Sequence, residues 1–259
     1  MKFYPFKKKF KGFRRPELKR YLFDFYSLYK KRPIKNNSGG MMFGTMFGLL
    51  YLDLLTDEWN VINNNHGLND AAIWDIIEYN NSLYIATAKG INEISIIDHS
   101  VIPNKKDSYN FLYELNIYDM DADSNYLYLA TNSGLFQMDW ETEKIITLSK
   151  REFTKIKYAN GSIFGTDGVL WNIKKGKEEK YITSNVHDFD ICGSYIWTSK
   201  NDRSVLLDTK NMQEWEYTQK DGIPGKNIYG ISCDKEWVWF LTNEGVAFYN
   251  WEQYHNENK

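Results

Sequence analysis

The chain has 259 residues, of which 42% are hydrophobic and 17% aromatic, and it carries 32 Lys and Arg residues against 34 Asp and Glu residues. This apolar content excludes a disordered chain, and a total of two cysteines excludes a disulfide-rich scaffold or a Cys-rich metal module. The formal net charge of −2 is misleading, because the charge is divided unevenly along the chain.

Residues 1–35 form a basic N-terminal arm. They hold 13 Lys and Arg residues against Glu17 and Asp24, a net charge of +11, whereas the rest of the chain carries −13. A basic arm on an acidic body is typical of proteins that bind nucleic acid, an anionic membrane surface or an acidic protein. The basic candidates for partner binding are Lys7, Lys8, Lys9, Lys11, Arg14, Arg15, Lys19 and Arg20.

An amphipathic helix is predicted within the arm, at about residues 17–30. Leu18, Leu22, Phe25 and Tyr29 recur at the spacing of one helical face and complete the candidate partner-binding set. Three roles stay open for this helix. It packs on the flank of the body, docks into a larger protein or ribonucleoprotein assembly, or lies in a membrane interface.

The arm does not have the pattern of a signal peptide, because basic residues interrupt every apolar run near its start. No stretch of 18 apolar residues occurs, so no membrane-spanning helix is expected. These features predict a cytoplasmic protein, which can still be peripheral to a membrane or to a large assembly.

A repeat organises the chain after residue 36. An apolar and aromatic run ends in Thr, and a turn and often a Gly lead into the next apolar run. The six threonines are Thr45, Thr87, Thr131, Thr166, Thr198 and Thr242. Their spacing of 32 to 44 residues fits the blades of a β-propeller, each a four-stranded sheet of roughly 40 residues. We therefore predict an all-β protein, with a basic arm over residues 1–36 and a single six-bladed propeller over 37–259.

Turn signals divide the better-defined blades into strands. In the third blade we predict strands at 117–122, 126–131, 135–140 and 144–148. In the second blade we predict them at 73–79, 83–87, 91–97 and, after an irregular loop, 109–115.

The first and last blades are incomplete in the repeat pattern. The last blade lacks an outer strand. Either residues 3–6 supply this strand, or the arm leaves the body and the strand is missing. Residues 33–36 are the candidate for the inner strand of the first blade.

Two stretches, Trp59 to Ile91 and Trp215 to Tyr249, share a Trp, a Gly-Leu or Gly-Ile-Pro loop, a strand, a second strand ending in Thr, and a Gly. This pattern resembles the propeller repeats of two-component regulators. Known members lie in the extracytoplasmic sensor halves of hybrid histidine kinases, usually with many more repeats. The resemblance implies a propeller fold and a ligand-sensing role, although this sequence shows no export signal, membrane span or kinase part.

The inner strands of a propeller line its central channel, and an alignment of these strands places three aspartates at one position. An acidic ring there predicts a site for a cation or a basic peptide; the alternative is a solvated channel that binds only water. The candidate residues, including the residues that fill or precede the same position in other blades, are Asp75, Asp119, Asp188, Lys155, Trp74 and Tyr118.

No catalytic motif occurs. The sequence lacks a Gly-x-Ser-x-Gly elbow and a phosphate-binding loop, and its four histidines have no metal-ligand spacing. Cys192 and Cys233 fall late in the inner strands of neighbouring blades, where we expect buried thiols in a reducing compartment. No catalytic residue, metal or cofactor is predicted.

These features favour a non-catalytic interaction or structural subunit, a propeller scaffold anchored through its basic arm to protein partners in a larger complex. Nucleic acid or an anionic membrane surface are further candidates for the arm's partner. The alternatives are a ligand-sensing propeller that uses the channel face and a peripheral membrane-surface protein.

Overall fold

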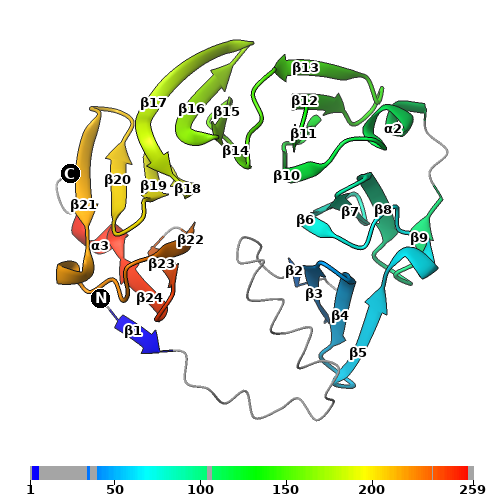
Figure 1. Cartoon of the computed structure of the whole chain (residues 1–259), viewed down its shortest axis with the longest axis horizontal. Helices are drawn as coiled ribbons and strands as arrows, with labels where there is room; N and C mark the ends of the chain where they lie inside the picture. Colours follow the sequence, from blue (N-terminus) through cyan, green and yellow to red (C-terminus); the bar gives the residue numbers. More distant parts are fainter. Residues whose placement is uncertain (1, 6–33, 36–39, 104–106, 235, 256–259) are drawn as a thin grey trace. The chain divides into compact units, whose positions relative to one another are not determined.

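The computed structural model describes residues 2–5, 34–35, 40–103, 107–234 and 236–255. Its strands form six four-stranded sheets, which confirms the predicted all-β, six-bladed β-propeller (Figure 1). The chain divides into two compact units, Phe13–Ile156 and Met1–Gly12 with Lys157–Lys259. The helix predicted at about residues 17–30, and every candidate residue of the arm, lie outside the described residues.

The unit Phe13–Ile156 holds the first three blades. The first blade contains β2 (Ile34–Lys35), β3 (Gly40–Thr45), β4 (Gly48–Asp53) and β5 (Glu58–Ile62). The second contains β6 (Ile73–Tyr79), β7 (Ser82–Thr87), β8 (Gly90–Ser95) and β9 (Val101–Ile102). The third contains β10 (Ile117–Ala122), β11 (Tyr126–Thr131), β12 (Gly134–Asp139) and β13 (Ile145–Ser149). A 3-10 turn, η2 (Asn64–His66), and a short helix, α2 (Asp107–Leu112), lie in the connections.

The other unit holds the last three blades, the first of which begins at the unit boundary. The fourth blade contains β14 (Lys155–Ala159), β15 (Ser162–Thr166), β16 (Gly168–Lys174) and β17 (Lys177–Val186). The fifth contains β18 (Asp188–Cys192), β19 (Tyr195–Ser199), β20 (Ser204–Asp208) and β21 (Gln213–Tyr217). The sixth contains β22 (Ile228–Cys233), β23 (Trp237–Thr242), β24 (Gly245–Asn250) and β1 (Lys2–Pro5). The 3-10 turn η3 (Gln219–Asp221) and the helix α3 (Trp251–His255) complete this unit.

The outer strand of the sixth blade comes from the N-terminus, the first of the two arrangements left open by the sequence. Strand β1 pairs antiparallel with β24, with Lys2 opposite Phe248 and Pro5 opposite Gly245. Figure 1 shows β1 beside β24, the last strand of the chain, in this sheet. Because β1 is an edge strand, its proline does not interrupt a hydrogen-bonded ladder on both sides. Ile34–Lys35 likewise supplies the predicted inner strand of the first blade by pairing with β3.

The prediction for the last strand of the second blade is wrong. Residues 107–112 form the helix α2, and Val101–Ile102 takes the place of the expected strand at 109–115. A tight turn explains the difference: the amide of His99 donates to the carbonyl of Ser95, so the chain reverses at once and pairs with β8. Pro103 follows the two-residue strand and has no amide hydrogen with which to extend the pairing.

The repeated threonines have a local structural role. Thr45, Thr87, Thr131 and Thr242 are buried, and each hydroxyl donates to the carbonyl oxygen of the Gly three residues later, at 2.7–2.9 Å. The same hydroxyl accepts the amide hydrogen of the residue two positions on. The Thr-x-x-Gly repeat therefore forms the turn between the second and third strands of a blade, and the buried Thr hydroxyl finds its hydrogen-bond partners within that turn.

The backbone conformation of this turn requires a glycine at its last position. Gly90 has a φ of +82°, and a Cβ added there would lie 2.7 Å from the carbonyl oxygen of Leu112. A side chain at this position would meet both a steric clash and an unfavourable left-handed backbone.

The hydrophobic core lies between successive blades within each unit. Met42 and Leu49 of the first blade pack with Ile73 and Leu83 of the second. Between the fifth and sixth blades, Trp197 is fully buried and forms an edge contact with Phe240, at 5.7 Å between ring centroids. Each blade thus uses a neighbouring blade of its unit to bury a face of its sheet.

No helix in the part of the chain that the structure describes is long and apolar enough to cross a membrane.

Candidate functional site

Three of the inner strands contain a β-bulge at the same position. The pairing of β6 with β7 skips Trp74, that of β10 with β11 skips Tyr118, and that of β22 with β23 skips Tyr229. A bulge leaves one residue unpaired and redirects its side chain, and bulges are common beside binding sites. Trp74 and Tyr118 are the two aromatic residues predicted for the channel face. Both lie at a bulge, and both are partly exposed.

Three aspartates that the sequence alignment places at one position of the inner strands, Asp75, Asp119 and Asp188, each connect their strand to a neighbouring inner strand. An Oδ2 atom of Asp75 accepts the amide hydrogen of Met120 at 2.8 Å, and that of Asp119 accepts the amide hydrogen of Ile156 at 2.6 Å. Asp188 accepts the amide hydrogen of Ile231 at 2.8 Å. In every case the donor directly follows the position that the sequence alignment made equivalent, namely Asp119, Lys155 and Gly230. This pattern confirms the alignment of the inner strands.

These hydrogen bonds give the aspartates a structural role that the sequence analysis did not predict. Asp119 and Asp188 are 4% and 1% exposed, so their carboxylates are turned towards protein and away from solvent. Lys155 is partly buried at the start of β14, and the indole nitrogen of Trp74 is buried without a hydrogen-bond partner. Binding of a cation or basic peptide by this set stays a prediction. Among the described residues, no group of three His, Cys, Asp or Glu side chains is placed to hold a metal ion.

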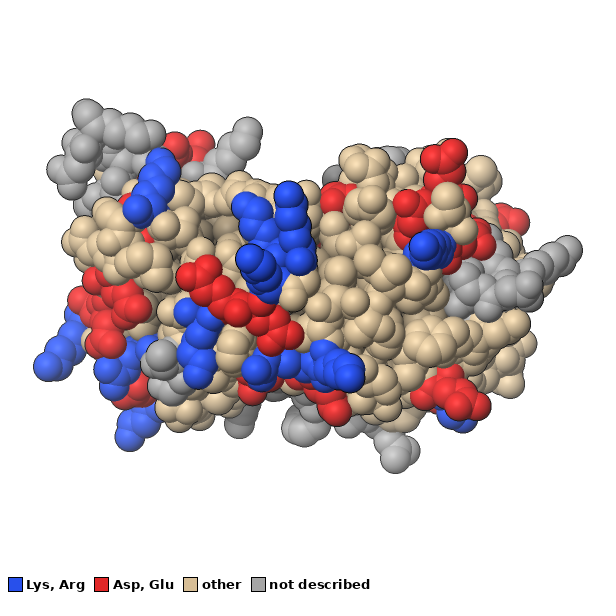
Figure 2. Space-filling model, turned by 90° about the horizontal axis from the view of Figure 1, so that it is seen from above, with Lys and Arg blue, Asp and Glu red and all other residues tan. Residues whose placement is uncertain are grey.

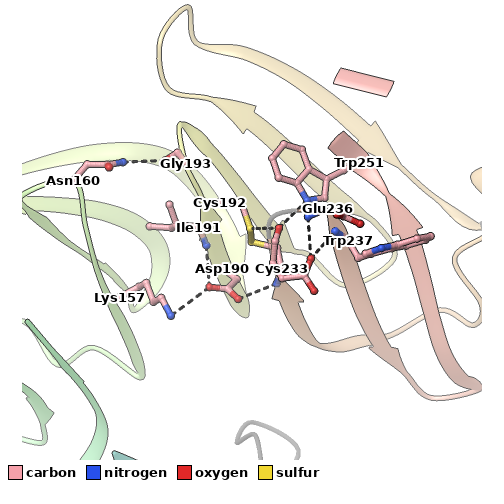
Figure 3. Close-up of a disulfide and its surroundings, with 11 residues drawn as sticks. Lys157, Asn160, Asp190, Ile191, Cys192, Gly193, Cys233, Glu236, Trp237 and Trp251 are labelled. Carbon is pink, nitrogen blue, oxygen red and sulfur yellow. Dashed lines mark hydrogen bonds and ion pairs between the residues drawn. A yellow bond between two sulfur atoms is a disulfide. The ribbon is translucent and has the colours of Figure 1, made fainter. Parts of the chain in front are cut away.

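Asp190 is a further inter-blade residue that the sequence analysis missed. It is 3% exposed, and its Oδ2 accepts the amide hydrogen of Cys233 at 2.9 Å. Its Oδ1 accepts the amide hydrogen of Ile191 and lies 3.7 Å from the Nζ atom of Lys157 on β14 (Figure 3). The signal was present, because Asp190 lies two residues after Asp188 and therefore on the same face of β18.

Cys192 and Cys233 form a disulfide, which corrects the expectation of two thiols. The residues end β18 and β22, are separated by 41 positions in the sequence, and have Cα atoms 6.2 Å apart. Their expected burial is confirmed, at 9% and 8% exposed. Both fall at the same end of neighbouring inner strands, which is the signal that could have predicted the bond.

A cavity of about 560 Å³ lies beside this disulfide. Its walls come from the turn after β18, the turn after β22 and the start of α3. Tyr195 and Trp251 meet edge to face at 5.3 Å, and the indole nitrogen of Trp251 donates to the carbonyl of Asp234. Lys210 and Glu252 add charges of opposite sign to the lining. The cavity combines aromatic surface with polar groups, which suits a small polar ligand.

No protein-family model and no curated protein matches the sequence. Solved structures do match. The extracellular domain of a putative hybrid two-component system from B. thetaiotaomicron is 17% identical with a TM-score of 0.69, over 88% of this chain and 34% of that one. BamB from Moraxella catarrhalis is 13% identical with a TM-score of 0.55, over 84% and 83% of the two chains.

PorZ is another similar structure, described as an essential bacterial surface component of the type-IX secretion system of Porphyromonas gingivalis. It is 13% identical with a TM-score of 0.59, over 83% of this chain and 30% of that one. What these proteins share is the fold. The resemblance to two-component-regulator propellers is thus confirmed in three dimensions, and the chain spans about a third of the length of the two-component domain.

Proposed function

We propose that this chain is a non-catalytic interaction subunit, a propeller scaffold that binds an anionic partner of a larger assembly through residues 6–33. Propellers related in fold include BamB and a surface component of a secretion system, which is consistent with a scaffold role. The observation that carries the proposal is the pairing of β1 and β2 on either side of this segment.

The basic segment is attached at both ends. β1 ends at Pro5 in the sixth blade and β2 begins at Ile34 in the first blade, so residues 6–33 join two paired strands. Within the segment, 11 Lys and Arg residues stand against two acidic residues, a net charge of +9. A concentration of one charge attracts an oppositely charged surface and accelerates association.

One face of the described residues carries charges of both signs. On the face drawn in Figure 2, Lys and Arg side chains alternate with Asp and Glu side chains, and neither sign covers the face. This face therefore attracts an anionic partner less than the segment does, with its net charge of +9.

The test compares two variants with equal charge loss. The first carries Lys7, Lys8, Lys9, Lys11, Arg14 and Arg15 as Gln, and the control carries the exposed Lys144, Lys150, Lys174, Lys175, Lys177 and Lys220 as Gln. Binding is measured to phosphatidylserine vesicles, duplex RNA and polyglutamate at several salt concentrations.

We expect the arm variant to lose at least tenfold in affinity for one probe and to show a weaker salt dependence, since it releases fewer counterions. The control should keep the affinity of the unmodified protein within about twofold. Equal losses in the two variants would contradict the proposal, and the probe that responds identifies the class of partner.

Ligand sensing is a second candidate, favoured by the cavity beside Cys192 and Cys233. A small ligand bound there would raise the Tm in proportion to the logarithm of its concentration over Kd. A screen of small polar compounds by thermal shift, with Tyr195→Ala as the variant that removes one aromatic wall, tests this role. A hit whose shift persists in Tyr195→Ala would place its binding elsewhere.

A further inference from the structure

We propose that the Cys192–Cys233 disulfide is a covalent lock between the inner strands of the last two blades, and that the protein acts in an oxidising compartment. The argument rests on how the two cysteines are placed, on what surrounds them and on where such bonds persist.

The two strand ends are held together by other interactions. Asp188 and Asp190 on β18 accept the amide hydrogens of Ile231 and Cys233 on β22, at 2.8 and 2.9 Å. These hydrogen bonds fix the two backbones beside each other, with the cysteine Cα atoms 6.2 Å apart, inside the usual range for a disulfide. The bond therefore forms between residues that the fold has already aligned, without backbone movement.

The surroundings are those of a structural bond. Both cysteines are more than nine-tenths buried, and they lie on different blades and not in a Cys-x-x-Cys motif. The Sγ atom of Cys192 lies 3.1 Å from the carbonyl oxygen of Asp234, and that carbonyl accepts a hydrogen bond from the indole nitrogen of Trp251 at 3.2 Å. The lock thus joins β18, β22 and the start of the C-terminal helix α3 in one packed cluster.

Formation of the bond requires an oxidant. The two thiols lose two protons and two electrons, and the disulfide of a thiol–disulfide oxidoreductase accepts them and becomes a dithiol. Structural disulfides persist where such oxidants dominate and are rare in the reducing cytosol. This inference opposes the cytoplasmic location expected from the sequence.

The cavity of about 560 Å³ makes the proposal testable in the folded protein. Both cysteines line it, so a small dithiol such as dithiothreitol has a route to the sulfur atoms. In the reduced protein the Cys192 thiol could donate to the nearby Asp234 carbonyl, so reduction should loosen the cluster without exposing an unsatisfied group.

The first experiment traps the cysteines in the native host. Cells are quenched in acid, free thiols are blocked with N-ethylmaleimide, and the purified full-length protein is analysed by peptide mass spectrometry before and after reduction. We expect a linked Cys192–Cys233 peptide pair and no maleimide on either residue before reduction. Maleimide on both residues would overturn the proposal.

The second experiment measures the lock itself. Dithiothreitol should lower the Tm of the unmodified protein by about 5–15 °C, as expected for loss of a disulfide in a protein of this size. The double variant Cys192→Ala, Cys233→Ala is the control, and its Tm should not respond to dithiothreitol. If mass analysis shows complete reduction and the Tm of the unmodified protein is unchanged, the bond is not a lock.

Discussion

Buried aspartates on the inner strands connect neighbouring blades, because each accepts the backbone amide hydrogen of a residue on the next inner strand. Asp188 is 1% exposed, and its hydrogen bond to the amide of Ile231 crosses from β18 to β22. A backbone amide buried at such a contact has no water to replace a lost acceptor. Removal of the carboxylate therefore costs the full desolvation penalty of the amide, beyond the modest net value of an ordinary hydrogen bond.

We expect Asp188→Ala to lower the free energy of unfolding by about 1–3 kcal/mol, because the amide of Ile231 loses its acceptor. Asp202→Ala is the matched control: Asp202 is exposed and pairs with Arg203 at the surface, where such pairs contribute about 0–1 kcal/mol. Urea unfolding followed by tryptophan fluorescence measures both variants. Similar losses of unfolding free energy in the two variants would show that the buried hydrogen bond of Asp188 contributes no more than the exposed ion pair of Asp202.

His99 provides a pH-dependent contribution at the residue scale. Burial lowers the pKa of its imidazole, although the charges of Asp98 and Asp53 act in the opposite direction, and the ring lies 4.1 Å from that of Tyr51. The folded protein therefore favours the neutral ring. Stability from this residue is complete above the unfolded pKa of about 6.5 and declines as the pH falls through it towards the lower folded value.

The variant His99→Asn tests this contribution, since Asn tolerates the positive φ of 57° at this turn. Between pH 7.5 and pH 5, the Tm of the variant should fall less than the Tm of the unmodified protein. A fall of the same size in both proteins would assign the acid sensitivity to other groups.

At the scale of elements, the sequence predicts strands well where turn residues bound a run of alternating apolar and polar residues. The four strands of the third blade were predicted to within one residue, because turns at 123–125 and 141–144 bound clear alternating runs. The second blade failed at its last strand, since a two-residue strand carries no periodicity and the helix α2 follows it. The inter-blade hydrogen bonds of Asp75, Asp119 and Asp188 were also missed, because they depend on how adjacent sheets pack and not on local pattern.

The disulfide joins two elements that the sequence had already placed on neighbouring inner strands. Their common position at the ends of these strands was the available signal, because sequence spacing alone does not decide whether two cysteines pair. In the loop-entropy description, closing a loop of 41 residues raises the free energy of the unfolded chain by roughly 4 kcal/mol. This is an upper value, which applies to a bond without strain.

Strand β1 gives a prediction at this scale. Deleting residues 2–5 removes the four pairings with Gly245–Phe248 and leaves the edge of β24 without its partner. An uncovered edge strand recruits another copy of the chain. We expect a lower Tm and concentration-dependent dimers or aggregates in size-exclusion chromatography. A monomer of unchanged Tm would show that β1 does not stabilise the sixth blade.

At the scale of the whole molecule, the pairing of β1 and β2 divides the basic arm into two blade strands and the segment between them. Residues 2–5 and 34–35 belong to two blades, as the sequence analysis allowed for both ends of the arm. The proposed partner-binding role therefore falls on residues 6–33 between them. Truncation of the whole arm would therefore remove two strands together with the charge. Charge neutralisation inside residues 6–33 separates these effects, because both strands remain.

The most direct test of the interaction-subunit proposal is quantitative affinity purification from the native host. The unmodified protein is compared with the six-residue arm variant, from Lys7 to Arg15, and with the six-residue body control. Circular dichroism first establishes that all three proteins are folded. We expect the same partners with the unmodified protein and the control, and at least a tenfold loss of them with the arm variant. An identical set of partners at equal yield from all three proteins would contradict the account.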